Sequence, residues 1–306
     1  MADVQQIEVA IRQDDASATF APRFQGPEEL RDADDTAGHA SNGTIPRMAL
    51  DGVARAPLSV SAVLPAYNEE AIIERTVRHV AGVLRDLTHD FEVIVTNDGS
   101  RDRTGEILQA LQHGEPDLHL RSITHGRNLG YGAALASGFD AASKDLVFLT
   151  DGDKQFDVRE LAEFLPAMDA HTDLVVGWRR NRADPPMRKL NALGWKWLVN
   201  GLFGYTARDV DCAFKLFRRR VWESVTVYAR GATFSAEFLI KARRLGFRVT
   251  ELPVTHYPRT AGSPTGARMD VIVRAFVEVF RLWRNLDREL AQDPRARRAR
   301  AASLSS

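Results

Sequence analysis

Residues 145–153 read Asp-Leu-Val-Phe-Leu-Thr-Asp-Gly-Asp, an apolar run that ends in two carboxylates. An apolar run of this length predicts a buried strand. Asp151 and Asp153 follow it, separated only by Gly152, so both carboxylates could hold one divalent cation without a side chain blocking access. The competing interpretation is a polar turn that caps the next helix, because Asp is common in turns.

Segments on both sides of this strand alternate between strand and helix patterns. Further strands are predicted at residues 59–65, 91–96, 118–123 and 174–177. Apolar residues spaced three or four apart predict helices near residues 73–87, near 107–111 and after Gly130. This alternation predicts an α/β fold with a mainly parallel sheet and helices on both faces.

Polar clusters follow three of these strands. They are Tyr67-Asn68-Glu69, Asn97-Asp98-Gly99-Ser100 and Asp151-Gly152-Asp153. Ligands of open α/β sheets bind beyond the carboxyl ends of the strands, so the three clusters should meet at one rim. Their convergence favours the metal-site interpretation, with Mg²⁺ or Mn²⁺ bridging a diphosphate and neutralising the leaving nucleotide.

Two weaker signals lie between the stronger ones. Asp98 precedes a glycine and is either a turn residue or a carboxylate that recognises a nucleobase or ribose. Asn128 and Gly130 lie in a glycine-rich turn before a predicted helix, where the backbone can approach a ligand closely.

Taken together and in order, these motifs resemble the family 2 glycosyltransferases, most closely the dolichyl-phosphate and polyprenyl-phosphate mannose or glucose synthases. The resemblance extends from about residue 59 to 265. It implies a Rossmann-like GT-A fold, inversion at the anomeric carbon and a divalent metal. The motifs are Leu64-Pro65-Ala66-Tyr67-Asn68-Glu69-Glu70, Asn97-Asp98-Gly99-Ser100, Arg127-Asn128-Leu129-Gly130 and Asp151-Gly152-Asp153-Lys154-Gln155-Phe156-Asp157.

The resemblance also implies roles on the donor side. Asp151, Asp153 and Gln155 would contact the diphosphate and the metal, and Arg179 would reach a donor or acceptor phosphate. Trp178 stands where the family more often has a small residue, and Gly152 and Lys154 replace the commoner Ala and Gly. The residues that would hold the rest of the donor are Pro65, Tyr67, Glu69, Asp98, Asn128 and Gly130.

The acceptor side is predicted from a second set of residues. Asp211 lies where many members of the family place a catalytic base, which would deprotonate a hydroxyl acceptor. A phosphate acceptor is already a good nucleophile at neutral pH and needs positive charge instead. The candidate cations are Arg188, Lys215 and Arg259; for any one of them alone, a solvated surface group is the favoured interpretation. Glu237 either supports the active-site wall or only complements a helix dipole.

Three functions therefore compete. The favoured one is transfer of a hexose from a GDP- or UDP-sugar to a polyprenyl or dolichyl phosphate. The second is a family 2 enzyme that glycosylates a carbohydrate or natural-product hydroxyl. The third is a non-catalytic nucleotide-sugar-binding module, which would not need the aspartate pair at residues 151 and 153.

Bulk properties set the domain organisation. The formal net charge is zero, which gives no reason to expect nucleic-acid binding, and the single Cys212 excludes an internal disulfide. No apolar run is long enough to span a bilayer, so we expect a cytoplasmic protein that is either soluble or peripheral on the cytoplasmic face of the membrane. Residues 190–205 favour membrane contact and the C-terminal helix favours docking on the protein. The predicted parts are a disordered leader (1–57), the GT-A domain (58–265), an amphipathic helix (266–292) and a basic disordered tail (293–306).

Overall fold

The computed structural model describes residues 55–152, 155–180, 186–231, 233–257 and 269–304. All of these lie in one compact unit, Gly43–Ser306. Most of the predicted leader lies outside the described residues. The described chain is already tied to the fold at Ala56, whose backbone N–H donates to the Leu87 carbonyl at 2.8 Å.

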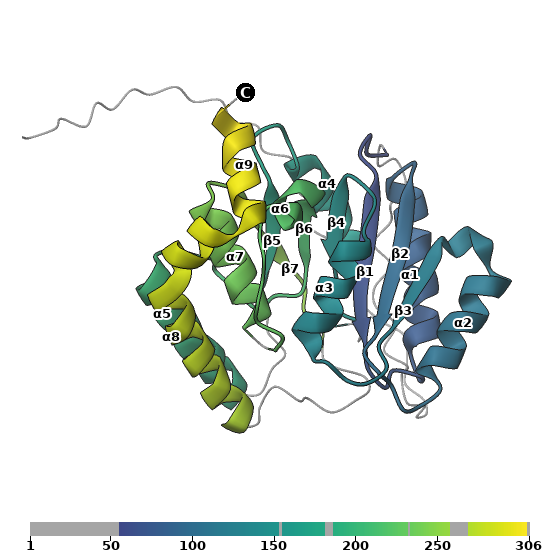
Figure 1. Ribbon diagram of the computed structural model, residues 1–306. Helices are drawn as coiled ribbons and strands as arrows, with labels where there is room; N and C mark the ends of the chain where they lie inside the picture. The colour runs from purple at the N-terminus through teal and green to yellow at the C-terminus, as the bar shows by residue number, and fades with distance from the viewer. Residues whose placement is uncertain (1–54, 153–154, 181–185, 232, 258–268, 305–306) are drawn as a thin grey trace, which may run out of the picture. The chain divides into compact units, whose positions relative to one another are not determined.

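One sheet organises the described residues, with its strands in the order β3-β2-β1-β4-β6-β5-β7 (Figure 1). Every pairing is parallel except those of β6, which runs antiparallel to both β4 and β5. This confirms the predicted α/β fold with a mainly parallel sheet. The strands are β1 Val60–Ala66, β2 Phe91–Asn97, β3 Leu120–Thr124, β4 Leu146–Leu149, β5 Leu174–Arg179, β6 Lys215–Arg218 and β7 Val249–Val254.

The sequence pattern did not indicate β6 or β7. β6 has only four residues, begins with a lysine and ends with an arginine. It becomes a central strand because β4 and β5 pair with its two edges, which buries even Lys215. Strand formation there depends on neighbours far away in the chain, and a local pattern cannot report them.

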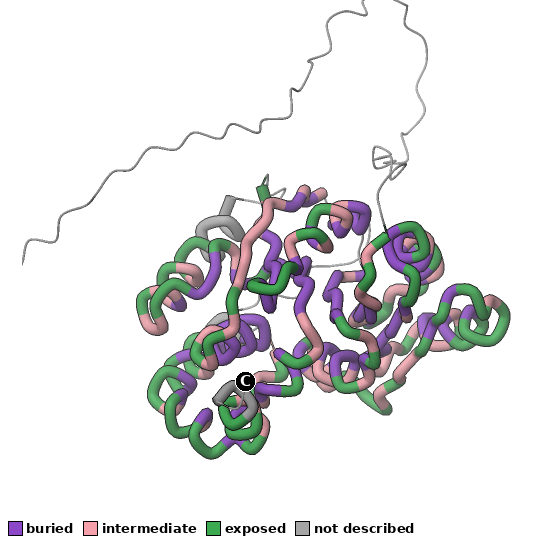
Figure 2. Tube along the Cα trace, turned by 90° about the horizontal axis from the view of Figure 1, so that it is seen from above, coloured by how far each residue is buried: buried purple, intermediate pink, exposed green. Residues whose placement is uncertain are grey.

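Helices cover both faces of the sheet, as predicted. One apolar core includes side chains of α1 (Ile73–Leu87), α2 (Thr104–Gly114) and α4 (Leu161–Ala167). The other core includes side chains of α3 (Tyr131–Ala141), α6 (Arg219–Glu223) and α7 (Phe234–Arg244), and also of α5 (Pro186–Phe203) and α8 (Met269–Gln292). Burial is concentrated on the inner side of the helices (Figure 2).

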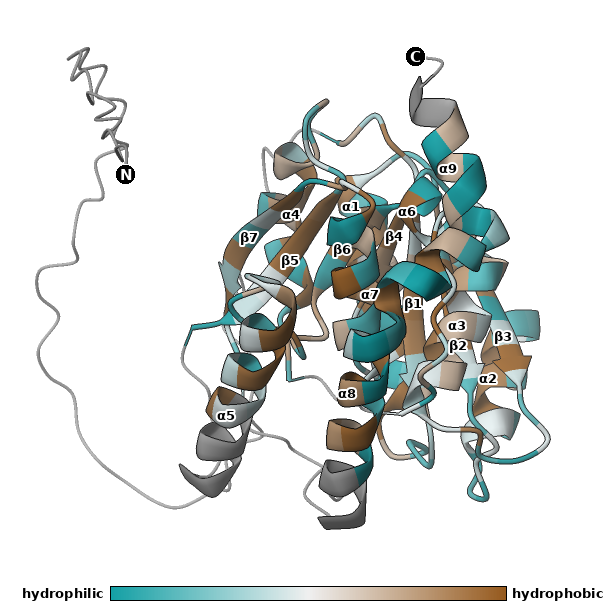
Figure 3. Ribbon diagram, turned by 60° about the vertical axis from the view of Figure 1, so that its left-hand side comes forward, coloured by the Kyte–Doolittle hydropathy of each residue, from teal (hydrophilic) through white to brown (hydrophobic). Residues whose placement is uncertain are grey.

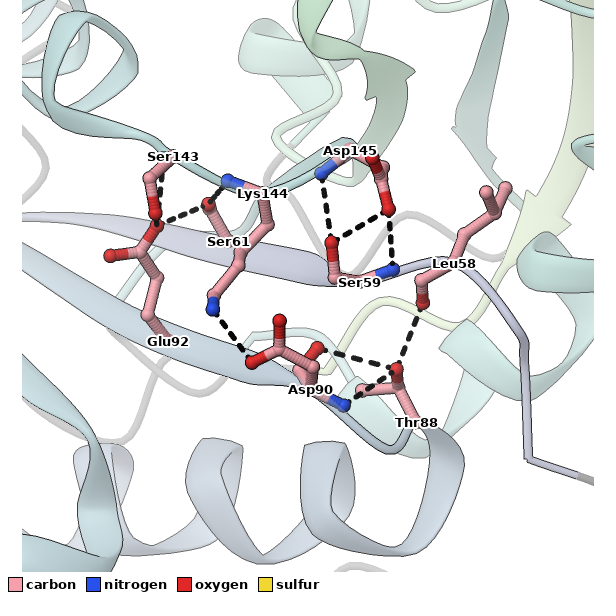
Figure 4. Close-up of polar contacts among 9 residues, drawn as sticks. All are labelled: Leu58, Ser59, Ser61, Thr88, Asp90, Glu92, Ser143, Lys144 and Asp145. Carbon is pink, nitrogen blue, oxygen red and sulfur yellow. Dashed lines mark hydrogen bonds and ion pairs between the residues drawn. The ribbon is translucent and has the colours of Figure 1, made fainter.

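Polar side chains tie the amino ends of the central strands together (Figure 4). Asp145 accepts hydrogen bonds from the backbone N–H of Ser59 at 3.0 Å and from its hydroxyl at 2.7 Å. Glu92 accepts from the Ser61 hydroxyl at 2.6 Å and from the backbone N–H of Ser143 at 2.8 Å. Because this network lies at the sheet edge opposite the carboxyl ends of these strands, we assign it to stability rather than to ligand binding.

The C-terminus departs from the prediction of a disordered tail. Residues Pro294–Leu304 form helix α9, so that prediction is wrong. Asp293, which is 4% exposed, accepts hydrogen bonds from the backbone N–H of Thr226 at 2.9 Å and of Arg295 at 2.9 Å. These bonds dock the start of α9 on the domain and satisfy a backbone donor of its first turn.

Helix α8 docks on the domain by one side, as expected. Val279, Leu282, Leu286 and Leu290 are buried, and Trp195 of α5 packs edge-on against Phe276 of α8 with ring centroids 6.2 Å apart. Brown, apolar turns are visible on both α5 and α8 in Figure 3. Within the described part of the chain, no helix is long and apolar enough to cross a membrane.

Candidate active site

The loops after β1 and β2 are locked together at the carboxyl edge of the sheet. Asn68 adopts a left-handed conformation (φ 57°), and its backbone N–H donates to the Ser100 hydroxyl at 2.9 Å. Its side-chain oxygen accepts from the backbone N–H of Arg101 at 2.8 Å. The backbone N–H of Glu69 donates to Thr104 at 2.8 Å. Tyr67 remains exposed beside this junction, where a ligand can reach its ring.

The carboxylate of Asp98 holds the second loop in place by accepting several hydrogen bonds. Its carboxylate, 3% exposed, accepts hydrogen bonds from the backbone N–H groups of Leu129 at 2.9 Å and Gly130 at 2.8 Å. The ring of His125 bonds to the same carboxylate at 2.7 Å and to Ser137 of α3 at 2.9 Å. Asp98 therefore stabilises the Asn128–Gly130 turn. Its contact with the nucleoside stays a prediction.

Two glycines permit this close packing. Gly99 has φ 70°, and a Cβ there would lie 2.3 Å from the carbonyl carbon of Arg127. Gly130 has φ 101°, and a Cβ there would lie 2.7 Å from the Arg230 carbonyl oxygen. Both positions need the left-handed conformation and the absence of a side chain. The glycine-rich signal in the sequence thus has a structural cause as well as a predicted binding role.

Asp151 joins this rim from β4. It is half-buried, and its carboxylate accepts a hydrogen bond from the Tyr131 hydroxyl at 3.1 Å. The next carbonyl, of Gly152, accepts from the Thr76 hydroxyl of α1 at 3.0 Å. The three polar clusters are therefore linked through α3 and the loops, which confirms the prediction that they converge on one rim.

The described residues include part of the predicted metal site. Asp151 and Gln155 offer carboxylate and amide oxygens, the donors that Mg²⁺ and Mn²⁺ prefer, and they fit such a cation chemically. Asp153, the second predicted carboxylate, lies outside the described residues. No group of three His, Cys, Asp or Glu side chains suited to a metal occurs in the part that the structure describes.

Gln155 also connects the predicted donor rim to the segment that precedes the predicted acceptor cation. Its side-chain amide donates to the Tyr257 carbonyl at 3.2 Å, and the backbone N–H of Tyr257 donates to its carbonyl at 2.8 Å. Arg259, the predicted acceptor cation, lies just beyond Tyr257 and outside the described residues. Arg188 belongs to the part of α5 whose side chains are not described.

A pocket of about 230 Å³ lies at the end of β5, bounded by α5 and the segment before β6. Its residues combine positive charge, aromatic rings and two aspartates. They are Trp178, Arg179, Arg180, Leu193, Trp195, Lys196, Arg208, Asp209, Val210 and Asp211.

Arg179 forms a bidentate ion pair with Asp209 in the wall of this pocket. Its Nε and one terminal nitrogen each lie 2.7 Å from an oxygen of Asp209. Burial is the largest single effect and lowers the pKa of the guanidinium. The hydrogen bonds to Asp209 and the charges of Asp209, Cys212 and Asp211 together outweigh burial and raise the pKa. Arg179 is therefore charged and held in a fixed orientation. Two of its nitrogens already donate to Asp209, which leaves fewer donors for the predicted phosphate contact.

Asp211 is exposed toward the pocket and has an unusual environment. The surrounding protein displaces much of the water near its carboxyl, and this effect, followed by the charge of Asp209, raises its pKa. Arg179 and Lys215 act in the opposite direction. A carboxyl with a raised pKa is a better proton acceptor than an ordinary aspartate once it is ionised.

The structure corrects the prediction for Lys215. Its side chain is 1% exposed, and its ammonium donates to the Cys212 carbonyl beneath the pocket. Burial lowers its pKa, against the opposing effects of Cys212, Asp211 and Asp209. The ammonium supports the wall of the pocket from inside and does not reach an acceptor phosphate.

Sequence reasoning missed several pocket residues. The guanidinium of Arg208 stacks over the Trp178 ring, 3.6 Å from its centroid, and Lys196 lines the same pocket. In the sequence, Trp178 stands out only as a departure from the family pattern, and that departure is the available signal. Nothing local in the sequence pairs Arg208 with Trp178, because their contact depends on the tertiary fold.

The chain belongs to glycosyl transferase family 2, whose model matches residues 61–226. It is 30% identical over 211 residues to a dodecaprenyl-phosphate galacturonate synthase of Rhizobium johnstonii, covering 67% of this chain and 61% of that protein. It is 29% identical to an undecaprenyl-phosphate 4-deoxy-4-formamido-L-arabinose transferase of Yersinia pestis, covering 70% and 64%. The chain thus spans about three fifths of the length of these curated relatives.

Solved structures confirm the GT-A type of fold. Glucosyl-3-phosphoglycerate synthase of Mycobacterium tuberculosis, bound to Mn²⁺, UDP-glucose and phosphoglyceric acid, superposes with a TM-score of 0.58 at 20% identity. The match covers 74% of this chain and 80% of that one. The same enzyme in complex with UDP gives a TM-score of 0.57.

Proposed function

We propose that this protein transfers a hexose, with inversion, from a GDP- or UDP-sugar to a polyprenyl or dolichyl phosphate. The observation that carries the proposal is the cationic, aromatic pocket beside the donor rim. Arg180, Lys196 and Arg208 line it together with the Arg179–Asp209 ion pair and Asp211. The names of the two curated relatives, both of which act on polyprenyl phosphates, support the same acceptor class.

The donor would lie on the rim formed by the β1, β2 and β4 loops. Tyr67 would contact the nucleoside, and the Asp98-organised turn at Asn128–Gly130 would approach the donor with its backbone. Asp151, Gln155 and the predicted Asp153 would hold Mg²⁺ or Mn²⁺. That cation would neutralise the charge that develops on the departing nucleoside diphosphate.

The acceptor phosphate would be held by the pocket cations. Arginine suits this task because its planar fork matches two phosphate oxygens. A phosphate monoester has its second pKa near 6, so it is already a nucleophile at neutral pH and needs positioning more than deprotonation. Arg259, just beyond the described Tyr257, stays a predicted contact.

Membrane contact is proposed from a second, larger groove. It measures about 730 Å³ and lies between α5 and α8. Apolar side chains line it beside Arg281 and Arg284, a combination that suits acyl chains with anionic headgroups. Since α5 also lines the acceptor pocket, a lipid acceptor could reach that pocket from the bilayer surface. We propose that the protein acts at a membrane surface, on the cytoplasmic face as expected from the sequence.

One observation favours an alternative acceptor. The raised pKa of Asp211 suits a general base, which a carbohydrate or natural-product hydroxyl would require. In that case the aromatic rings of Trp178 and Trp195 would line a sugar-binding site. The remote alternative is a non-catalytic nucleotide-sugar-binding module. It does not explain the cationic pocket, because such a module binds no acceptor.

The decisive experiment compares Asp211→Asn with the unmodified protein. GDP-mannose, UDP-glucose and UDP-N-acetylglucosamine are first screened with Mn²⁺ by calorimetry, and the donor that binds is tested for transfer to a polyprenyl phosphate. For a phosphate acceptor, the variant should retain transfer within about tenfold, because no base is needed.

Three other results would point elsewhere. Loss of about 10²-fold or more in the Asp211→Asn variant would indicate a hydroxyl acceptor that needs a base. Transfer to a soluble glycan but not to polyprenyl phosphate would contradict the proposed acceptor. Donor binding with neither hydrolysis nor transfer would favour the module.

A further inference from the structure

A strap of backbone, residues 226–230, crosses the start of α3 next to the donor rim. The backbone N–H of Gly132 donates to the Arg230 carbonyl at 2.9 Å. A Cβ on Gly132 would lie 2.9 Å from the Ala229 carbonyl oxygen, so the strap and α3 pack at backbone contact. The neighbouring residue, Tyr131, donates its hydroxyl to Asp151 of the donor rim.

A buried ion cluster anchors the strap. Glu237 of α7 accepts hydrogen bonds from the backbone N–H groups of Tyr228 at 3.0 Å and Ala229 at 2.8 Å. Lys241, one turn further along α7, pairs with Glu237 at 2.6 Å and donates to the Thr226 carbonyl at 2.8 Å. The side chains of Lys241 and Glu237 are 1% and 7% exposed, so solvent screens their pair weakly.

The third member of the cluster comes from the C-terminal helix. Glu289 of α8 lies 2.9 Å from the ammonium of Lys241. A second contact comes from Asp293, directly after α8, which binds both the backbone N–H and the hydroxyl of Thr226. A continuous series of contacts thus leads from α8 to Asp151, through the ion cluster, the strap and the start of α3.

We infer that Glu289 and Lys241 are positioning residues for the donor site, and that docking of α8 fixes the strap and through it Tyr131 and Asp151. A lysine buried this completely has a high desolvation cost, which the two carboxylates and the Thr226 carbonyl offset together. Removing one carboxylate weakens the hold on the strap. The inference rests on the proposed function, because it concerns the proposed donor site. It also connects that site to α8, which borders the proposed membrane groove.

The test uses Glu289→Gln, with Asp287→Asn as its matched control. Asp287 is also on α8 and also pairs with α7, at 3.0 Å from Arg244, but that pair is exposed and does not touch the strap. Both variants lose one negative charge and one contact between the same two helices. Only Glu289→Gln alters the ion cluster.

Backbone amide exchange provides a readout independent of activity. In Glu289→Gln, exchange should quicken at residues 226–230 and 130–134 by about tenfold, because the ion pair between Glu289 and the buried Lys241 is lost. Asp287→Asn should leave both segments unchanged. Glu289→Asp, which keeps the charge, should restore most of the protection. Equal exchange in the two charge-neutralising variants would overturn the inference.

Kinetics then assign the effect to the donor side. The donor KM of Glu289→Gln should rise about tenfold, while the acceptor KM stays within about twofold. An equal rise in both KM values would indicate a general loss of structure and would also overturn the inference. If no donor supports transfer, the proposed function fails, and the amide-exchange comparison still decides the role of the cluster.

Discussion

Gly132 illustrates how a single residue limits what the active site can tolerate. It is buried where the strap crosses α3, and a Cβ there would meet the Ala229 carbonyl oxygen, the Arg230 carbonyl carbon and the Phe234 side chain, all at 2.9 Å. Two of these three contacts are backbone atoms, which cannot move aside as a flexible side chain can. An added methyl group must therefore displace the strap.

We expect Gly132→Ala to destabilise the protein by about 1–3 kcal/mol through overpacking. Denaturant unfolding measures the change. Gly82 of α1 is the control, because a Cβ there meets nothing within 4 Å and its helical position favours alanine. Gly82→Ala should stabilise by about 0.5–1 kcal/mol. If both substitutions had the same sign, the packing of the strap on α3 would be contradicted.

Asp98 joins the local geometry of the second loop to the proposed donor binding. Replacing it with asparagine would turn one carboxylate oxygen into an N–H₂ group that faces a backbone or ring donor. We expect Asp98→Asn to cost about 1.5–3 kcal/mol of stability, the range for hydrogen bonds to charged groups. Donor affinity, measured by calorimetry, should fall with it. Asp117→Asn, in the short 3₁₀ helix Pro116–Leu118 where Asp117 is exposed, should change neither quantity.

Asp211 gives a pH dependence of stability whose sign follows from its raised pKa. The folded state binds this proton more tightly than the unfolded state, so ionisation costs stability as the pH rises from the ordinary value of 3.8 through the raised one. Asp211→Asn removes that cost. We expect a higher melting temperature for the variant at pH 7 and no difference near pH 3; a variant that melts lower at pH 7 would contradict this assignment.

At the scale of elements, α8 has two different sides. Val279, Leu286 and Leu290 are buried against the domain, whereas Phe280 and Trp283 are about half exposed. The buried side explains docking, which the sequence pattern predicted. Phe280 lines the groove shared with α5. The sequence favoured membrane contact for residues 190–205, which lie largely in α5. Helices α5 and α8 therefore contribute to one surface, which we propose contacts lipid.

We expect the double variant Phe280→Glu/Trp283→Glu to lose binding to anionic liposomes in a flotation assay, because two half-exposed aromatic side chains, proposed to contact lipid, would be replaced by charges that anionic headgroups repel. Added salt should weaken binding of the unmodified protein through Arg281 and Arg284. The control adds the same charges to exposed positions of α2, Gln109→Glu and Ala110→Glu. Liposome binding that survives in the first variant would contradict a membrane role for α8.

At the scale of the whole molecule, the C-terminal helices complete the second core. Leu282, Leu286 and Leu290 of α8 and Ala296 of α9 belong to the apolar cluster on that face of the sheet. Each buried leucine contributes about 1.5–3 kcal/mol. Glu289 and Asp293 add the polar contacts to Lys241 and Thr226.

A chain that ends at residue 268 should therefore melt at least about 10 °C lower, because losing several kilocalories per mole shifts the midpoint of a domain of this size by several degrees for each. Circular dichroism would measure the melting temperature. A chain that ends at residue 304 is the control. An unchanged midpoint would show that α8 and α9 are dispensable appendages.

The local sequence pattern was enough to predict strands β1 to β5 and the convergence of the three polar clusters. Apolar runs, helical spacing and strand-end motifs are properties of neighbouring residues, so they can be read from the sequence. Tertiary structure decided the rest. The four residues of β6 became a central strand only through β4 and β5, and Lys215 became buried rather than available to phosphate. The partnership of Trp178 with Arg208 and the ion cluster of Glu237, Lys241 and Glu289 join residues distant in the chain. Only folding brings such charges into contact and removes the water that would otherwise screen them.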